Sequence, residues 1–144
     1  MLWGVTKTRI LGLDIGDRRI GVAMSDPQGI LASPLTIIDR TDEPSDINAI
    51  IDIIERNQVV VVVVGLPLSM NGTAGPQAQK VLSFTQELSK HTKVPIEHRD
   101  ERLTTVSAQR LLKMNRKRRR VRDDAAAAAL ILQGYLDEGA SLKG

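Results

Sequence analysis

The sequence has no cysteine, and its 144 residues include one Trp, one Tyr and one Phe. Without cysteine there are no disulfides and no thiolate metal sites, and the two histidines leave a zinc site dependent on carboxylate ligands. With so few aromatic residues, the core has to be aliphatic. The longest apolar run, residues 59–64, falls far short of the roughly 20 residues that span a bilayer, and the N-terminal residues show no signal-peptide pattern. We therefore expect a cytoplasmic protein that does not bind membranes.

The length and the 42% hydrophobic content fit one folded domain covering residues 1–144. The net charge is only +3, but the positive charge is unevenly placed. Seven of the 20 basic residues fall within residues 113–122, so the other 13 are outnumbered by 17 acidic residues. Such a stretch predicts a flexible loop that binds the phosphates of a nucleic acid, or else a solvated surface loop. Its basic residues are Lys113, Arg116, Lys117, Arg118, Arg119, Arg120 and Arg122.

Hydrophobic periodicity predicts an α/β fold. The first two predicted strands read as a hairpin, and a third antiparallel strand follows them. Six consecutive valines at 59–64 indicate a strand buried on both faces, as in a parallel sheet covered by helices. The order of elements therefore predicts a mixed sheet with helices on both faces. Strands are expected at 9–15, 20–24, 30–38, 59–64 and 93–98, and helices at 44–56, 75–90, about 104–114 and 125–136.

Carboxylates lie at the ends of two predicted strands. Asp14 has apolar neighbours, and desolvating it is costly unless it faces a metal or another positive group; the alternative is that it caps the turn at Gly16. Asp100 and Glu101 follow the fifth predicted strand, where alternation lets only one of them face Asp14. We favour Glu101 because its side chain is longer, and we expect Asp100 to pair with Arg102. A pure salt bridge is the alternative for this second pair.

A third acidic pair, Asp123 and Asp124, opens the alanine-rich helix. Aspartate is a favoured N-cap, which alone would explain one of the two. The five alanines at 125–129 would let the helix lie close to the sheet and carry an aspartate toward Asp14 and Glu101. Three carboxylates meeting there would bind Mg²⁺ or Mn²⁺ through oxygen. Two such ions can activate a water and stabilise the leaving oxygen of a phosphodiester.

The segment after the valine strand contains glycine, proline and several polar residues. A shaped loop at the carboxyl end of a parallel strand is a usual place for a ligand. Gly65, Ser69, Asn71 and Thr73 are the candidate residues of this substrate loop, because hydroxyl and amide groups can donate to a phosphate or sugar. A plain strand-to-helix connection explains the same residues equally well.

Taken together and in order, these motifs resemble the YqgF/RuvX family over nearly the whole chain. They are Leu-Asp-Ile-Gly at 13–16, Arg-Ile-Gly-Val-Ala at 19–23, Gly-Leu-Pro at 65–67, Asn-Gly-Thr at 71–73, Asp-Glu-Arg-Leu-Thr-Thr at 100–105, and Asp124 before the alanine-rich helix. The resemblance implies an RNase H-like fold whose five-stranded sheet has three antiparallel strands and then two parallel ones. It also implies an acidic metal site at Asp14, Glu101 and Asp124, with Asp123 and Asp100 as second choices.

The function implied by this resemblance is a metal-dependent nuclease, with Mg²⁺ or Mn²⁺ as cofactor. We favour 5′-end processing of pre-16S rRNA in ribosome biogenesis, with an rRNA precursor as substrate. Resolution of Holliday junctions in branched DNA is the alternative, and it would require a two-fold dimer. A non-catalytic RNA-binding assembly module is a further hypothesis. A phosphotransferase of the actin and sugar-kinase type is a weaker one, because it needs two domains. We expect a monomer or a weak homodimer.

Overall fold

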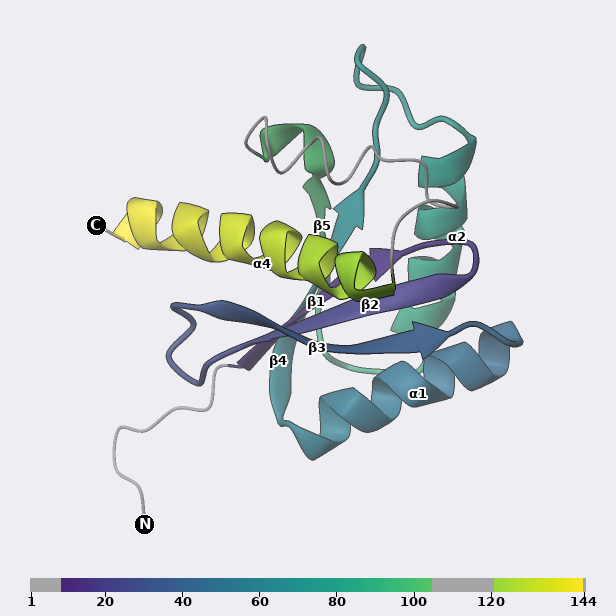
Figure 1. The fold of residues 1–144 in the computed structure, drawn as a ribbon, viewed down its shortest axis with the longest axis horizontal. Helices are drawn as coiled ribbons and strands as arrows, with labels where there is room; N and C mark the ends of the chain where they lie inside the picture. The colour runs from purple at the N-terminus through teal and green to yellow at the C-terminus, as the bar shows by residue number, and fades with distance from the viewer. Residues whose placement is uncertain (1–8, 105–120, 144) are drawn as a thin grey trace.

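The structure, a computed structural model, describes residues 9–104 and 121–143, with side chains at 9–104 and 124–139 (Figure 1). The predicted helix at about 104–114 and most of the basic stretch at 113–122 lie outside these residues. The described elements are β1 (Arg9–Ile15), β2 (Arg19–Ser25), β3 (Ala32–Asp39), α1 (Glu43–Arg56), β4 (Val59–Leu66), α2 (Pro76–Ser89), β5 (Ile96–Asp100), the 3₁₀ turn η1 (Glu101–Leu103) and α4 (Val121–Lys143).

The five strands form one mixed sheet in the order β3-β2-β1-β4-β5. Neighbours β1–β2 and β2–β3 are antiparallel, whereas β1–β4 and β4–β5 are parallel. This arrangement confirms the predicted sheet of three antiparallel strands followed by two parallel ones. The carboxyl ends of β1, β4 and β5 therefore lie along the same edge, where the chemistry of a mixed α/β sheet is usually placed.

Helices cover both faces of the sheet, as predicted, with α1 and α2 on one face and α4 on the other (Figure 1). Alternation along β1 sends Leu11 and Leu13 into the core with α1 and α2. It therefore sends Gly12 and Asp14 to the α4 face. On β4, Val62 and Val64 join the larger core and Val63 packs under α4.

Helix α4 lies unusually close to its face of the sheet because the strands under it carry glycine. A Cβ built on Gly12 would come within 2.8 Å of Cβ of Leu132, and one on Gly21 would collide with the backbone carbonyl of Asp124. On the helix side, Ala127 and Ala128 are fully buried. The expectation that the alanine-rich helix approaches the sheet is thus confirmed.

Several predicted boundaries differ from those of the structure, most clearly in β5 and α4. Strand β5 begins at Ile96 rather than at residue 93 and continues through Asp100, because its residues pair with β4 as far as Leu66. Helix α4 begins at Val121. Asp124 therefore lies inside the first turns of this helix and is not its N-cap, so capping does not explain this aspartate.

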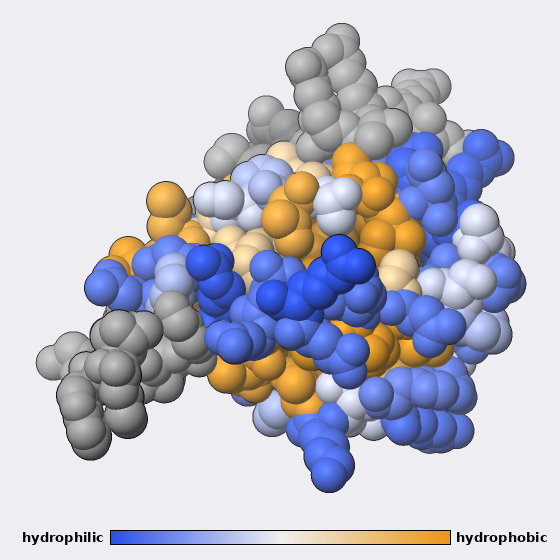
Figure 2. All heavy atoms as spheres, turned by 90° about the horizontal axis from the view of Figure 1, so that it is seen from below, coloured by the Kyte–Doolittle hydropathy of each residue, from blue (hydrophilic) through white to orange (hydrophobic). Residues whose placement is uncertain are grey.

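Apolar surface remains exposed around the edge strand. Ile30 and Leu31, which precede β3, are 65% and 61% exposed, and Leu35 within it is 47% exposed. On the face drawn in Figure 2, hydrophobic areas lie on both sides of a band of hydrophilic side chains. Within residues 9–104 and 121–143, no helix is long and apolar enough to cross a membrane.

Gly21→Ala tests the close contact between α4 and the sheet. The added methyl group would meet backbone atoms of Asp124, which cannot move without displacing the helix. We expect the free energy of unfolding in urea to fall by about 1–3 kcal/mol or more. Gly139→Ala is the control, since a Cβ there meets nothing within 4 Å, and it should leave stability unchanged or slightly higher. Equal effects of the two substitutions would contradict this packing.

Candidate active site

Asp14 lies near the end of β1 on the α4 face and is only 2% exposed. Its partner in the β1–β2 ladder is Gly21, and Gly65 lies one residue beyond the last β1–β4 pair, Leu13 with Val64. Both neighbours of Asp14 along this row therefore lack side chains. We call this row of Gly21, Asp14 and Gly65 the glycine strip. A carboxylate buried on it is shielded from water, and its Oδ2 atom has almost no solvent contact.

Glu101 reaches the same strip from η1, immediately after β5. Its Oε1 atom lies 2.9 Å from the position that a Cβ on Gly65 would take, and this oxygen is buried. The side chain therefore extends back over β4 into the space left by Gly65. Ile131 of α4 fills the rest of that space, with its Cδ1 atom 2.5 Å from the same Cβ position. The structure thus places Glu101 and Asp14 on adjacent parts of one face.

Asp124 comes to the strip from α4 and is 6% exposed. Its backbone rests on Gly21, and its Oδ2 atom accepts a hydrogen bond of 2.8 Å from Nε of Arg19. Arg19 has no assigned role among the predictions from the sequence. The signal was present, because Arg19 lies two residues before Gly21 on β2 and therefore shares its face.

These side chains have the chemistry of a site for a hard divalent cation, because carboxylate oxygens are the ligands that Mg²⁺ and Mn²⁺ prefer. Asp14, Glu101 and Asp124 come from three different elements to one strip. However, no three His, Asp or Glu residues among those the structure describes are arranged closely enough to hold a metal. The donors fit such an ion by type, while the Oδ2 atom of Asp124 is bonded to Arg19.

Of the two second-choice metal ligands, Asp123 and Asp100, the structure describes only the side chain of Asp100. The side chain of Asp123 lies outside the described part of the chain. Asp100 forms the expected pair with Arg102, whose Nη2 atom lies 2.7 Å from Oδ2 of Asp100. The hydrogen bonds from the Arg102 side chain are the main cause that lowers the pKa of the Asp100 carboxyl. Asp100 is therefore an ion-pair partner on the side of β5 away from Glu101.

The predicted substrate loop divides into two parts. Gly65 belongs to β4, where Glu101 and Ile131 cover it, so it is a strand residue of the strip. In the following loop, Ser69 Oγ lies 2.6 Å from both Asn71 Oδ1 and Thr73 Oγ1.

Arg102 ties this loop to the end of β5. Its Nη1 atom donates to the carbonyl of Met70 at 3.1 Å, and its guanidinium packs beside Gly72. Gly72 adopts a φ of 84°, which favours glycine. The loop is therefore held by its own hydroxyl and amide groups and by Arg102.

The basic residues at 113 and 116–120 lie outside the described residues, and of Arg122 only the backbone, in the first turn of α4, is described. The stretch leads directly into the helix turns that carry Asp124. Its proposed contact with phosphates stays a prediction.

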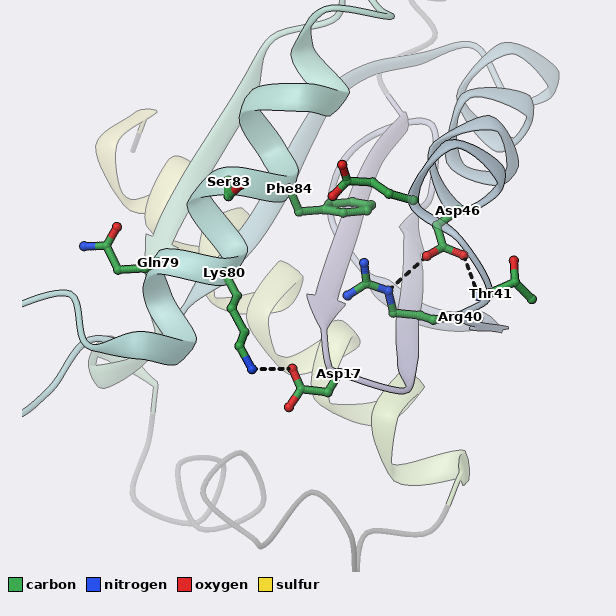
Figure 3. A pocket seen from close by; sticks show the side chains of 9 residues that line it. Asp17, Arg40, Thr41, Asp46, Gln79, Lys80, Ser83 and Phe84 are labelled. Atoms are coloured by element: carbon green, nitrogen blue, oxygen red, sulfur yellow. Dashed lines mark hydrogen bonds and ion pairs between the residues drawn. The ribbon is translucent and has the colours of Figure 1, made fainter.

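A separate pocket of about 620 Å³ opens between α1, α2 and the turn after β1 (Figure 3). Arg40 lines this pocket. Its Nε atom lies 3.1 Å from Oδ2 of Asp46, and its guanidinium lies over the Phe84 ring. Its Nη1 atom donates to the carbonyl of Gly16 at 3.0 Å. Arg40 therefore braces the turn that follows Asp14.

Arg99 is a buried cation on the α4 face of β5. It is 6% exposed, its guanidinium packs against Gly134, and its Nε atom lies 3.1 Å from Glu138. This contact fixes the second half of α4 to β5. Gly134 is needed because a side chain there would overlap the guanidinium.

Arg40→Met tests the brace behind the turn. Removing the guanidinium leaves Asp46, which is 2% exposed, with a lost charged hydrogen bond, and the free energy of unfolding should fall by about 1.5–3 kcal/mol. Arg56→Met is the matched control, because the Arg56–Asp52 pair is largely exposed and such pairs contribute about 0–1 kcal/mol. Urea denaturation of both variants measures the difference. Similar losses would show that the contacts of Arg40 stabilise the protein no more than an exposed ion pair does.

A family model described as "RuvX: Holliday junction resolvase" matches residues 8–138. Two similar proteins carry the name "Putative pre-16S rRNA nuclease". The one from Roseiflexus sp. (strain RS-1) is 49% identical over 132 residues, which is 90% of this chain and 94% of that protein. The one from Clostridium botulinum (strain Hall) is 48% identical over 132 residues, covering 90% and 96%.

Among solved structures, the chain resembles T. thermophilus RuvC in complex with a Holliday junction substrate, with a TM-score of 0.57 at 12% identity over 92% of this chain and 96% of that one. It also resembles the yeast mitochondrial Holliday junction resolvase, with a TM-score of 0.56 at 15% identity over 96% and 81%. At these identities the likeness shows the fold alone, and it confirms the predicted RNase H-like architecture.

Proposed function

Since the chain belongs to the RuvX family, we propose that it is a metal-dependent nuclease that cleaves phosphodiester bonds at the glycine strip. The observation that carries this proposal is the approach of three carboxylates to the glycine strip from β1, η1 and α4: Asp14 and Asp124 are buried, and Oε1 of Glu101 is a buried atom. Burying acidic groups together on one face is costly unless positive charge compensates them.

Asp14, Glu101 and Asp124 would hold Mg²⁺ or Mn²⁺ through their carboxylate oxygens. When bound, such ions activate a water and stabilise the leaving oxygen. The protein's part is to fix the carboxylates and to exclude water from them. The glycine strip does this because the Glu101 carboxylate occupies the space of a side chain at Gly65 and the Asp124 backbone occupies that at Gly21, while Ile131 covers Gly65 from the α4 side.

We propose precursor 16S rRNA as the substrate, with trimming at its 5′ end in the cytoplasm. Support comes from relatives of that name at 48–49% identity over nine-tenths of the chain. The junction resolvases share the fold at only 12–15% identity. Cleavage of an RNA end needs one site, so a monomer or weak homodimer of this single domain is sufficient. Resolution of branched DNA remains the second candidate, favoured by the description of the matching family model.

Asp14→Asn tests the proposed metal site. Loss of the carboxylate should reduce Mn²⁺-dependent cleavage of a pre-16S rRNA fragment by more than about 100-fold, the upper range for disturbing a metal ligand's outer partners. Calorimetry should show weaker Mn²⁺ binding, with an unchanged circular dichroism spectrum. Asp52→Asn, an exposed aspartate on α1, is the control and should retain full activity. A wild-type protein with no cleavage of RNA or junction substrates would rule out the nuclease.

Neutralising the basic stretch separates binding from catalysis. Glutamine at the six arginine and lysine positions within 116–122 should weaken RNA binding and lower the slope of log affinity against log salt by roughly 0.7–0.9 for each lost phosphate contact. Arg56→Gln with Lys90→Gln, both exposed and outside the stretch, should change neither quantity. If binding falls here but Asp14→Asn leaves cleavage intact, the protein is a binding module and not a nuclease.

A further inference from the structure

The ion pair of Arg19 with Asp124 joins two rigid parts of the site. Arg19 begins β2, and its carbonyl accepts a hydrogen bond of 2.9 Å from the amide of Gly16, which fixes the turn. Asp124 is fixed from the other side because its backbone rests on Gly21. The Arg19 side chain is 23% exposed and that of Asp124 is 9% exposed, so the 2.8 Å contact is largely shielded from water.

Arginine at this position can bind more than one group at a time. A guanidinium offers five donors in a planar fork. Within the described residues, Nε is the only side-chain donor of Arg19 that has a partner. The remaining donors lie at the edge where the strands carrying the carboxylates end, and the side chain is partly exposed there. Guanidinium groups so placed bind phosphate oxygens well.

A carboxylate oxygen bonded to Arg19 is not available to a cation in the same geometry. We propose that Arg19 competes with the divalent cation for Asp124: it neutralises Asp124 before the cation binds and contacts the scissile phosphate once the cation is bound. This inference rests on the proposed nuclease function.

If Arg19 competes with the cation, removing it changes the metal affinity in the opposite direction from removing a residue that only supports the fold. If Arg19 occupied Asp124 only to hold the fold, removing it would loosen the site and weaken metal binding. If it competes, removing it should tighten metal binding while it slows cleavage. Metal affinity measured without nucleic acid therefore distinguishes the two roles.

The experiment is calorimetric titration of the full-length protein with Mn²⁺. Arg19→Gln should bind Mn²⁺ about tenfold more tightly than wild type, as expected from losing a charged hydrogen bond that competes for the ligand. Arg19→Lys keeps the charge and should stay close to wild type. Arg18→Gln removes a neighbouring exposed charge without touching Asp124, so it should change the affinity less than twofold.

The same Arg19→Gln substitution is also made in an Asp124→Asn variant, which gives a double-mutant cycle. In that variant Arg19→Gln should no longer change the Mn²⁺ affinity. Cleavage by Arg19→Gln at saturating Mn²⁺ should fall at least tenfold through the loss of the phosphate contact. Arg19→Met, which keeps the aliphatic stem, replaces Arg19→Gln should the latter lose its circular dichroism signal.

Unchanged or weaker Mn²⁺ binding by Arg19→Gln would overturn the inference, as would an equal gain in the Asp124→Asn background. If Asp14→Asn abolishes Mn²⁺ binding while Arg19→Gln leaves it unchanged, only this inference fails. If the wild-type protein binds no Mn²⁺, both the proposed function and the inference fail.

Discussion

The contact between α4 and the sheet is the constraint on which the site depends. Glycine on the strands and alanine on the helix let the two backbones approach more closely than ordinary side chains permit. Because of this approach, the backbone of Asp124 lies on Gly21. The missing side chain at Gly65 also leaves room for the Glu101 carboxylate, which comes from η1. Larger residues in the strip would move the three carboxylates apart even though Asp14, Glu101 and Asp124 themselves were unchanged. Packing and chemistry are therefore set by the same few glycines.

Electrostatics provide the second constraint, since acidic side chains buried together repel one another and lose their hydration. In the described structure Arg19 neutralises Asp124 directly. Arg40 acts on the opposite face, where it binds the Gly16 carbonyl and Asp46 and keeps the turn after Asp14 in place. The site is thus held between an arginine that bonds to one of its carboxylates and an arginine that supports the backbone beside it.

Much of the fold was predictable because hydrophobic runs and turn residues indicate its strands and helices locally. The valine run indicated a strand buried on both faces, and the structure places Val62 and Val64 in one core and Val63 in the other. The paired turns indicated antiparallel hairpins, and β1–β2 and β2–β3 are antiparallel. The errors arose where tertiary pairing decides. Strand β5 extends to Asp100 because β4 pairs with it, and α4 starts at Val121, ahead of its aspartates. Strand alternation could have placed Arg19 on the face of Gly21, but its pairing with Asp124, 105 residues away, was not predictable.

The sequence by itself determined the element types, the carboxylates at strand ends and the concentration of positive charge at 113–122, since each depends on residue type and short-range spacing. The tertiary structure alone decided which side chains share the glycine strip and how close they come. It placed Arg19 on Asp124 and Arg102 on the Met70 carbonyl, contacts that no local pattern specifies. The physical reason is that register and helix docking bring distant residues together, and these depend on packing over the whole sheet.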